Sequence, residues 1–338
     1  MDVLGRALIQ AGHRALTTFG PGSPYGAPAL LGALVFAALY YVRRRRSRGR
    51  PMSLRAFLRS IFAKRIIMHP SSLLDLRMWA INALVLTTAY GMLAVGGLTF
   101  RDLVAGALTQ GFGAHAPLVW PVALVIAIAT FCELLAYELA YWFGHYCFHR
   151  FPALWEFHKV HHSAEVMTTL TEMRQHPVEI LAFVNLIGIA TGSVFGILIY
   201  VFGPGAHPYT LLNGNIALML FLLTWGHLRH SHIWIAFPGL AGKLFQSPAH
   251  HQIHHSDDPR HFNRNLGFAL AIWDWAFGTL YVPSTRREVV RFGVGERQAD
   301  FDSVAKSFLL PFLRSGKHLA PVALPTDIDA ADALKSRQ

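Results

Sequence analysis

Five long apolar runs, separated by polar or basic segments, dominate the pattern of this chain. A helix that crosses a bilayer needs roughly 20 mostly apolar residues. The runs predict spanning helices at about Pro28–Val42, Met78–Leu98, Leu118–Tyr141, Glu179–Phe202 and Tyr209–Trp225. We therefore expect an all-α, polytopic membrane protein with four to five transmembrane helices.

The first run is the shortest, and a signal peptide is the competing interpretation. A signal peptide carries its positive charge before the apolar run and a small-residue cleavage site after it. Here the charge follows the run, in Arg43-Arg44-Arg45-Arg46, so a retained anchor is the better interpretation. The next segment, Met52–Met68, mixes apolar residues with arginine and lysine. This mixture predicts an amphipathic helix that lies on the membrane surface.

The distribution of arginine and lysine predicts the orientation. Residues 43–77 hold eleven of these residues, whereas residues 99–117 hold only Arg101 and residues 203–208 hold none. Because basic loops are retained in the cytoplasm, we expect the Arg43 run on the cytoplasmic side and the N-terminus outside. Alternating the spans then places residues 142–178 and 226–338 in the cytoplasm. The expected location is an integral, multi-pass membrane protein, in the inner membrane if the source is bacterial.

Composition narrows the function classes. Of the 338 residues, 53% are hydrophobic and only 14% are charged, whereas soluble domains average roughly 25% charged. The net charge of +11 raises the question of nucleic-acid binding. Since the basic residues border apolar spans, contact with anionic lipid head groups explains them more simply, and we expect no nucleic-acid partner. The two cysteines, Cys132 and Cys147, lie too far apart on one predicted helix to form a disulfide.

Three histidine clusters, here called boxes, carry the candidate chemistry. They contain His145 and His149; His158, His161 and His162; and His251, His254 and His255. Each box has i, i+3 or i+4 spacing, which places its imidazoles on one face of a helix. A helix from Leu118 would be about 48 Å long at His149, at ~1.5 Å per residue, and the hydrocarbon core is only ~30 Å thick. The boxes should therefore project from the membrane together, in a cytoplasmic helical cap.

Eight imidazoles are more than one metal ion needs, and imidazole suits iron, zinc and copper. Because each triple can offer ligands to two neighbouring ions, the boxes predict a dinuclear metal centre at the membrane edge. Such a centre favours oxygen chemistry on a lipid. Isolated histidines such as His207 are expected to play no part in it.

The boxes and their surroundings resemble the fatty acid hydroxylase superfamily, which includes the sterol desaturases. The likeness covers roughly residues 125–283. It rests on the HxxxH, HxxHH and HxxHH series, on residues 246–255, and on the closing stretch 272–281 (Ile-Trp-Asp-Trp-Ala-Phe-Gly-Thr-Leu-Tyr). The resemblance implies an integral membrane oxidoreductase with a non-haem di-iron centre, O₂ as co-substrate and a lipid as substrate. Zinc could replace the two iron ions in a purified sample.

The resemblance also implies further site residues. The family places another ligand about twenty residues before the last box, and His230 fits this place; His227 and His232 are neighbours that could substitute for it or support it. The candidate additional or supporting residues are His176, His227, His232, His250, Asn265 and Asp274. No catalytic residue is expected beyond the metal ligands.

The implied domain organisation has three parts. Residues 1–76 would form the anchor span, the basic run and the interfacial segment, residues 77–283 the membrane catalytic domain, and residues 284–338 a C-terminal cytoplasmic tail. The chain shows no fused haem-binding His-Pro-Gly-Gly motif, so we expect an external electron donor: a cytochrome b5-like protein, a ferredoxin or a reductase.

Hydroxylation of a membrane lipid is the leading function, with a fatty acyl, sterol, hopanoid or related lipid as substrate. Desaturation of a sterol-type lipid at the same centre is the close alternative. A metal transporter is a more remote one, since transport ligands should lie near mid-membrane. A lipid-binding relative without activity is disfavoured because the boxes are complete.

Overall fold

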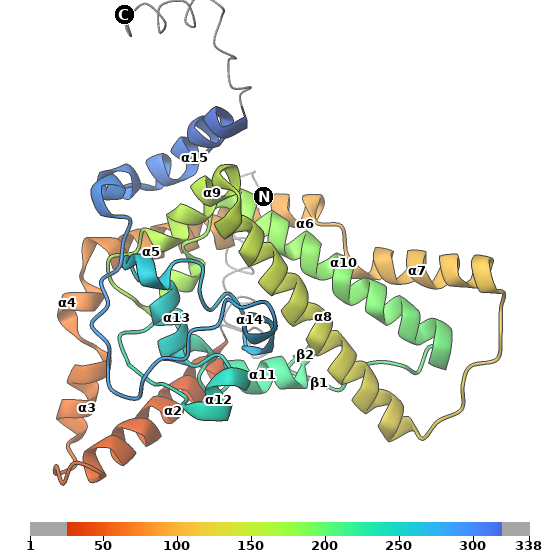
Figure 1. The fold of residues 1–338 in the computed structure, drawn as a ribbon, viewed down its shortest axis with the longest axis horizontal. Helices are drawn as coiled ribbons and strands as arrows, with labels where there is room; N and C mark the ends of the chain where they lie inside the picture. The colour runs from red at the N-terminus through yellow and green to blue at the C-terminus, as the bar shows by residue number, and fades with distance from the viewer. Residues whose placement is uncertain (1–25, 320–338) are drawn as a thin grey trace, which may run out of the picture.

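The computed structural model describes residues 26–319, and these form a mostly helical protein (Figure 1). The first half contains α2 (Ala27–Arg46), α3 (Leu54–Ile61), α4 (Lys64–Ile67), α5 (Pro70–Ala80), the π-helical η1 (Ile81–Leu86), α6 (Thr87–Leu93), α7 (Gly97–Phe112), α8 (Val122–Arg150) and α9 (Pro152–His162). The second half contains η2 (Thr169–Met173), α10 (Pro177–Phe202), β1 (Thr210–Leu211), β2 (Gly214–Asn215), α11 (Ile216–Leu222), η3 (Gly226–Leu228), α12 (Gly239–Leu244), α13 (Pro248–His254), η4 (Pro259–His261), α14 (Ile272–Ala276), η5 (Gly295–Phe301) and α15 (Val304–Leu319).

Within the described residues, four helical stretches are long and apolar enough to cross a membrane. They are Ala27–Arg46, Ala89–Phe112, Val122–Arg150 and Pro177–Phe202. The all-α prediction with four to five spans is thus confirmed. The predicted spans at Pro28, Leu118 and Glu179 correspond to α2, α8 and α10, while the other two predicted spans need correction.

The second span lies further along the chain than the predicted Met78–Leu98. That segment is divided among α5, η1 and α6 and is interrupted before α7, which occupies the stretch expected to be a polar loop. Glycines explain the placement of α7. Gly188, Gly192 and Gly196 form a stripe on α10, and a Cβ at Gly192 would clash with the carbonyl oxygen of Gly97. Small residues at this spacing let two helix backbones approach closely in a membrane, so α7 lies along α10 (Figure 1).

The predicted fifth helix, Tyr209–Trp225, is wrong as a continuous span. The segment forms the β1–β2 hairpin followed by the short helix α11. Thr130 of α8 forms two hydrogen bonds with this segment. Its hydroxyl accepts from the Tyr209 amide, and its carbonyl accepts from Asn215 Nδ2. Irregular backbone at membrane depth is tolerated where protein groups bind it in this way. The segment therefore runs along α8 toward the histidines without a full helix.

Helices α8 and α10 extend from the part of the protein that contains the candidate spans into a second region, which contains α9, α13 and α15 (Figure 1). Residues 284–319 are not detached from the rest, although the sequence suggested a tail. Phe301 is buried with Met78 and Val160, and the Phe308 carbonyl lies 3.0 Å from His176 Nε2. The expected disorder of residues 325–338 falls outside the described residues.

The segment predicted to be amphipathic forms α3 and α4. Leu54, Leu58 and Phe62 are exposed there, while Arg55 and Arg59 lie on the same short segment. The apolar exposure fits a helix that lies on a lipid surface.

Candidate metal centre

Nine histidines from four separate segments meet in two adjoining groups. The first group contains His145, His149, His158, His162 and His254; the second contains His161, His230, His251 and His255. Within each group, one nitrogen of every ring lies within 4.8 Å of the others. These nine are the residues that the sequence named as ligands, and eight of them are buried, with His149 half-buried.

Helix geometry distributes the boxes between the groups. His145 and His149 lie one turn apart at the end of α8 and belong to the first group. In α9, His158 and His162 face the first group while His161 faces the second. The α13 box divides in the opposite way, with one histidine in the first group and two in the second. Each triple thus contributes to both groups, which lie against one another.

The two groups share a wall of stacked imidazoles. The ring centroids of His162 and His255 lie 4.5 Å apart, and those of His251 and His254 lie 5.2 Å apart, with both pairs nearly parallel. In each pair one ring belongs to the first group and the other to the second. Ions held by the two groups would therefore be neighbours.

Hydrogen bonds fix the ring orientation in the first group. His145 Nδ1 donates to the Leu266 carbonyl at 2.7 Å, and His254 Nδ1 donates to the Arg264 carbonyl at 2.9 Å. Because a carbonyl only accepts, these Nδ1 atoms carry the protons and the Nε2 atoms present lone pairs. His254 Nε2 is buried and has no hydrogen-bond partner among the described residues.

A metal ion would resolve this arrangement of lone pairs. Nδ1 of the His158 ring lies 2.8 Å from Glu179 Oε1. The other nitrogen of this ring, Nε2, lies 3.0 Å from His145 Nε2. Two lone pairs at this distance repel unless a cation lies between them. Ligands about 2.1 Å from one ion and at right angles are about 3.0 Å apart. The donor set of the first group therefore fits a metal ion.

The second group is equally tight. His230 Nε2 lies 3.1 Å from His161 Nε2, 2.7 Å from His251 Nε2 and 3.2 Å from His255 Nε2. Three ring nitrogens, from α9 and the α13 box, thus converge on Nε2 of His230. This convergence gives His230, and neither of its neighbours, the position expected of the additional ligand.

Burial keeps these imidazoles neutral. Removal from water, with a smaller contribution from the neighbouring His254, lowers the pKa of His161 to about 3. Burial likewise lowers the pKa of His254 to about 4. A neutral imidazole is the form that binds a metal ion, so the groups are in their binding form at physiological pH.

Two buried carboxylates support the histidines, and the sequence analysis named neither as part of the site. Glu179 of α10 holds His158 through the 2.8 Å contact to Nδ1. Glu172 lies 3.9 Å from His230 Nδ1 and pairs with Arg229 at 2.6 Å. An ionisable residue at the end of an apolar span is a functional signal, and this signal was available for Glu179. Nothing comparable in the sequence marks Glu172.

Two of the suggested additional histidines cap the N-termini of helices. His176 caps α10, because its Nδ1 accepts from the Val178 amide, and it packs against Phe157. His250 forms a capping box with Ser247 at the start of α13, and its Nε2 lies 3.0 Å from the Gly242 carbonyl. Neither belongs to a histidine group.

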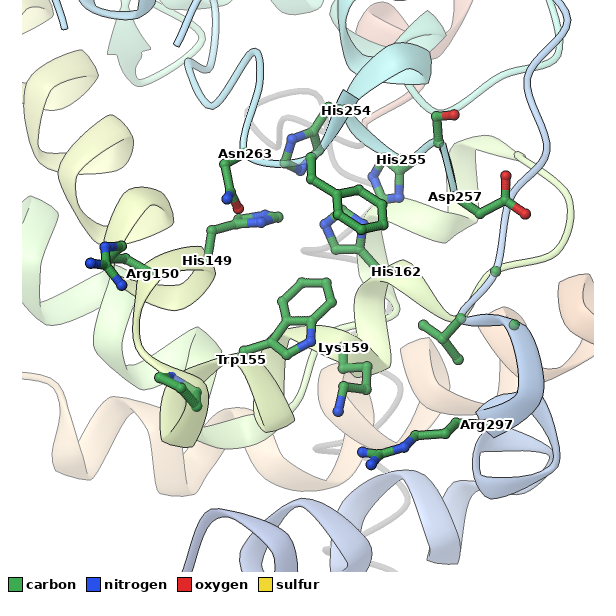
Figure 2. A pocket seen from close by; sticks show the side chains of 16 residues that line it. His149, Arg150, Trp155, Lys159, His162, His254, His255, Asp257, Asn263 and Arg297 are labelled. Atoms are coloured by element: carbon green, nitrogen blue, oxygen red, sulfur yellow. The ribbon is translucent and has the colours of Figure 1, made fainter. Parts of the chain in front are cut away.

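The two neighbours of His230 differ in position. His227 is buried in η3, beside the second group but not within it. His232 points away from both groups, and its Nε2 lies 2.5 Å from the Ser60 carbonyl of α3. Asn263, which the sequence did not suggest, lines the same cavity as His149 (Figure 2).

Asp274 and Asn265 shape the loop that carries Leu266. Asp274 accepts from the amides of Leu266 and Gly267, both at 2.8 Å, and from the Gln246 side chain at 2.6 Å. Asn265 adopts a left-handed conformation with φ of +57° and donates to the His250 carbonyl. Both residues therefore support ligand candidates through the backbone, since Leu266 receives the His145 hydrogen bond.

A cavity of about 670 Å³ opens onto both groups (Figure 2). His149, His162 and His254 of the first group and His255 of the second line it, and Trp155 lies across from them. The Trp155 ring centroid is 5.1 Å from those of His149 and His162. The cavity provides access to the centre, with an aromatic wall beside the first group.

Comparisons with known proteins match the part of the chain that contains the histidine groups. Residues 130–279 match the family model described as fatty acid hydroxylase. The chain is 28% identical over 228 residues to the ornithine lipid hydroxylase OlsE of Rhizobium tropici. This match covers 65% of this chain and 61% of that protein. It is 28% identical over 175 residues to the alkylglycerol monooxygenase of Danio rerio, a match that covers 50% of this chain and 35% of that protein. It is 25% identical over 170 residues to the alkylglycerol monooxygenase of Homo sapiens, a match that covers 49% of this chain and 34% of that protein.

The chain thus spans about three fifths of the first relative and about a third of the other two. No solved structure matches it. The matched segment begins within α8 and ends beyond α14, and it contains all nine clustered histidines. Residues 130–279 are therefore similar to the fatty acid hydroxylase family.

Proposed function

We propose that this protein catalyses the O₂-dependent hydroxylation of a membrane lipid at a centre in which its nine clustered histidines hold two iron ions. The single observation that carries the proposal is the pair of adjoining groups, with five and four imidazoles, that open onto one cavity. The relatives are by name lipid hydroxylases and monooxygenases. When bound, the iron pair would supply the reduction of O₂ and the oxidation of a C–H bond.

The division of ligands favours two ions. His145, His149, His158, His162 and His254 would hold one ion, and His161, His230, His251 and His255 the other. An all-imidazole donor set suits iron and also accepts zinc. The Leu266 and Arg264 carbonyls and Glu179 would keep the rings aimed at the ions, since partners of this kind fix ligand tautomers.

An apolar groove supports a lipid substrate. It has a volume of about 730 Å³ and runs between α8 and α10, lined by Leu139, Phe143 and Leu186 among others. It reaches Tyr146, which lies between the two histidines of the first box on α8. A hydrocarbon chain lying in this groove would leave the bilayer beside the centre. Trp155 would limit the access of water to the first group.

An external electron donor completes the proposal, because the reduction of O₂ consumes electrons that the lipid alone does not provide for hydroxylation. We place the centre on the cytoplasmic side of the membrane, as the arginine and lysine distribution indicates. A metal-transport role is less compatible with the geometry, because the histidines gather at the end of α8 and in short helices rather than along the spans.

Lipid mass spectrometry tests the function. Cells expressing the wild-type chain should accumulate a lipid that has gained one oxygen atom, and this atom should carry the isotope when labelled O₂ is supplied. Loss of two hydrogen atoms from a lipid, with no oxygen gained, would instead identify desaturation.

Matched variants connect the product to the centre. His149→Ala, His161→Ala and His254→Ala should each abolish the new lipid, because each removes a ligand from a different box. His207→Ala is the control, since His207 belongs to neither group. Full product formation in all three box variants would refute the proposal.

A further inference from the structure

A second, smaller pocket lies where α2 ends, away from the histidines. Its volume is about 270 Å³, and it shares no lining residue with the cavity at the metal centre. Five arginines line it: Arg44, Arg45, Arg48, Arg50 and Arg287. Four of them come from the basic run after the first span, and the fifth comes from a segment more than 200 residues further along the chain.

Most of this positive charge is uncompensated. Among the described residues, Arg44, Arg48, Arg50 and Arg287 have no ion pair and no side-chain hydrogen bond. Arg45 donates to the Pro51 carbonyl at 2.7 Å and lies over the Tyr41 ring. None of the described lining residues is acidic.

The nearest acidic residue in sequence to Arg287 is already engaged. Glu288 accepts from the Tyr281 hydroxyl at 2.9 Å and from the Ser284 amide at 2.9 Å. Five guanidinium groups around one hollow repel one another unless an anion lies among them. The pocket therefore has the charge of an anion-binding site.

The walls of the pocket are held in place by the fold. The Tyr40 hydroxyl donates to the Trp234 carbonyl at 2.7 Å, which ties α2 to the segment after His230. His232 Nε2 lies 2.5 Å from the Ser60 carbonyl, which ties the same segment to α3. Trp234 is buried against Ala249 and Ile253 of α13. The pocket is thus a built feature between three parts of the chain.

The surroundings indicate a lipid. The pocket adjoins the end of α2, one of the candidate spans, and Ser60 and Ile61 of α3 line it. On α3 the side chains of Leu54 and Leu58 are 72% and 43% exposed. An apolar surface beside a cluster of arginines fits the boundary between acyl chains and head groups.

We propose that this pocket binds the phosphate-bearing head group of an anionic phospholipid, whose acyl chains lie along α2 and α3. The guanidinium groups would bind the phosphate oxygens through paired N–H donors. The volume suits a head group rather than a whole lipid. The inference does not depend on the proposed hydroxylase activity, because it concerns a separate pocket and a binding event.

Native mass spectrometry of the purified full chain in detergent tests the proposal. The probes are phosphatidylglycerol as the anionic lipid, phosphatidylcholine as the zwitterionic lipid, and inorganic phosphate as the free anion. The wild type should retain phosphatidylglycerol more strongly than phosphatidylcholine, and millimolar inorganic phosphate should not displace the lipid. Complete displacement by phosphate would show a free-anion site and contradict the lipid assignment.

Two pairs of variants separate the pocket from general surface charge. Arg44→Gln/Arg48→Gln removes two charges from the pocket, and we expect phosphatidylglycerol affinity to fall about tenfold or more. Arg43→Gln/Arg46→Gln removes two charges from the same run that do not line the pocket, and its affinity should stay within about threefold of the wild type because these charges do not contact the head group.

The second pair tests the distant segment. Arg287→Gln should weaken phosphatidylglycerol binding, whereas the adjacent Arg286→Gln, outside the pocket, should leave it unchanged. Equal losses in pocket and control variants would overturn the proposal, as would equal retention of the two lipids. Unchanged metal content in every variant would show that the histidine groups remain folded.

Discussion

Oε1 of Glu179 lies 2.8 Å from Nδ1 of His158, and both side chains are almost completely buried. This contact joins the start of α10 to the second histidine box in α9. It leaves His158 Nε2 directed at His145 Nε2, 3.0 Å away. A span that would otherwise serve only as a membrane anchor thus fixes the orientation of a candidate ligand.

Substitution of Glu179 should weaken metal binding without removing a ligand. Loss of a carboxylate that holds a ligating histidine typically costs 10–100-fold in metal affinity. We expect about this loss in Glu179→Ala, and a smaller loss in Glu179→Gln because the amide oxygen still accepts from Nδ1. Competitive metal titration of the purified variants measures both. Wild-type affinity in Glu179→Ala would show that the contact does not orient His158.

His230 and His232 provide a close comparison, since they lie two residues apart and only one joins a group. His230→Ala should reduce metal content and abolish lipid oxidation. His232→Ala should retain its metal, because its ring contacts the Ser60 carbonyl of α3. Metal analysis of the two purified variants distinguishes them. The assignment of the additional ligand would be wrong if His232→Ala lost its metal and His230→Ala kept it.

His176 should make stability depend on pH. Burial lowers its pKa to about 4 in the folded state, whereas an unfolded histidine titrates near 6.5. Between these values the unfolded state binds the proton and the folded state does not, so stability falls as pH falls from about 6.5 to about 4. This single residue accounts for up to about 3 kcal/mol of that loss.

The variant His176→Asn isolates the effect of His176, because asparagine can still cap α10. Its unfolding temperature should fall less between pH 6.5 and pH 4 than that of the wild type. Thermal unfolding of the two proteins at matched pH values provides the measurement. Parallel curves for the two proteins would contradict the assignment.

Membrane sidedness can be tested by cysteine labelling in a background without Cys132 and Cys147. A membrane-impermeant maleimide should label His207→Cys in intact cells, because the loop after α10 is expected outside. Val289→Cys, at a position 98% exposed, should react only after the membrane is opened. The reverse pattern at both sites would refute the cytoplasmic placement of the histidines.

The sequence predicted the histidine groups better than it predicted the spans, and the physical reason is spacing. Imidazoles at i, i+3 and i+4 share a helix face wherever the helix lies, so the eight histidines of the boxes could be named without knowing the fold. The ninth candidate, His230, came from the family resemblance. A hydrophobic run does not indicate which other helix it packs against. The shifted second span depends on glycine contacts between Gly97 and Gly192, which link positions far apart in the chain.

The fifth apolar run illustrates another limit. Hydropathy treats Tyr209–Trp225 as one helix, but part of its backbone is satisfied by Thr130 of α8. Such tertiary hydrogen bonds have no local signature. The supporting role of Glu172 is equally invisible, since it depends on the approach of η2 to Arg229. By contrast, Glu179 stands within an apolar run, where a carboxylate needs a partner.

If the two histidine groups hold one metal ion each, as we propose, metal analysis of purified protein made with iron available should show it. The wild type should contain close to two ions per chain. His145→Ala/His254→Ala removes ligands only from the first group and His251→Ala/His255→Ala only from the second, so each should lose about one ion. The control His115→Ala/His207→Ala should retain both. One ion per chain in the wild type, or two ions in either ligand variant, would show that the two groups do not each hold an ion.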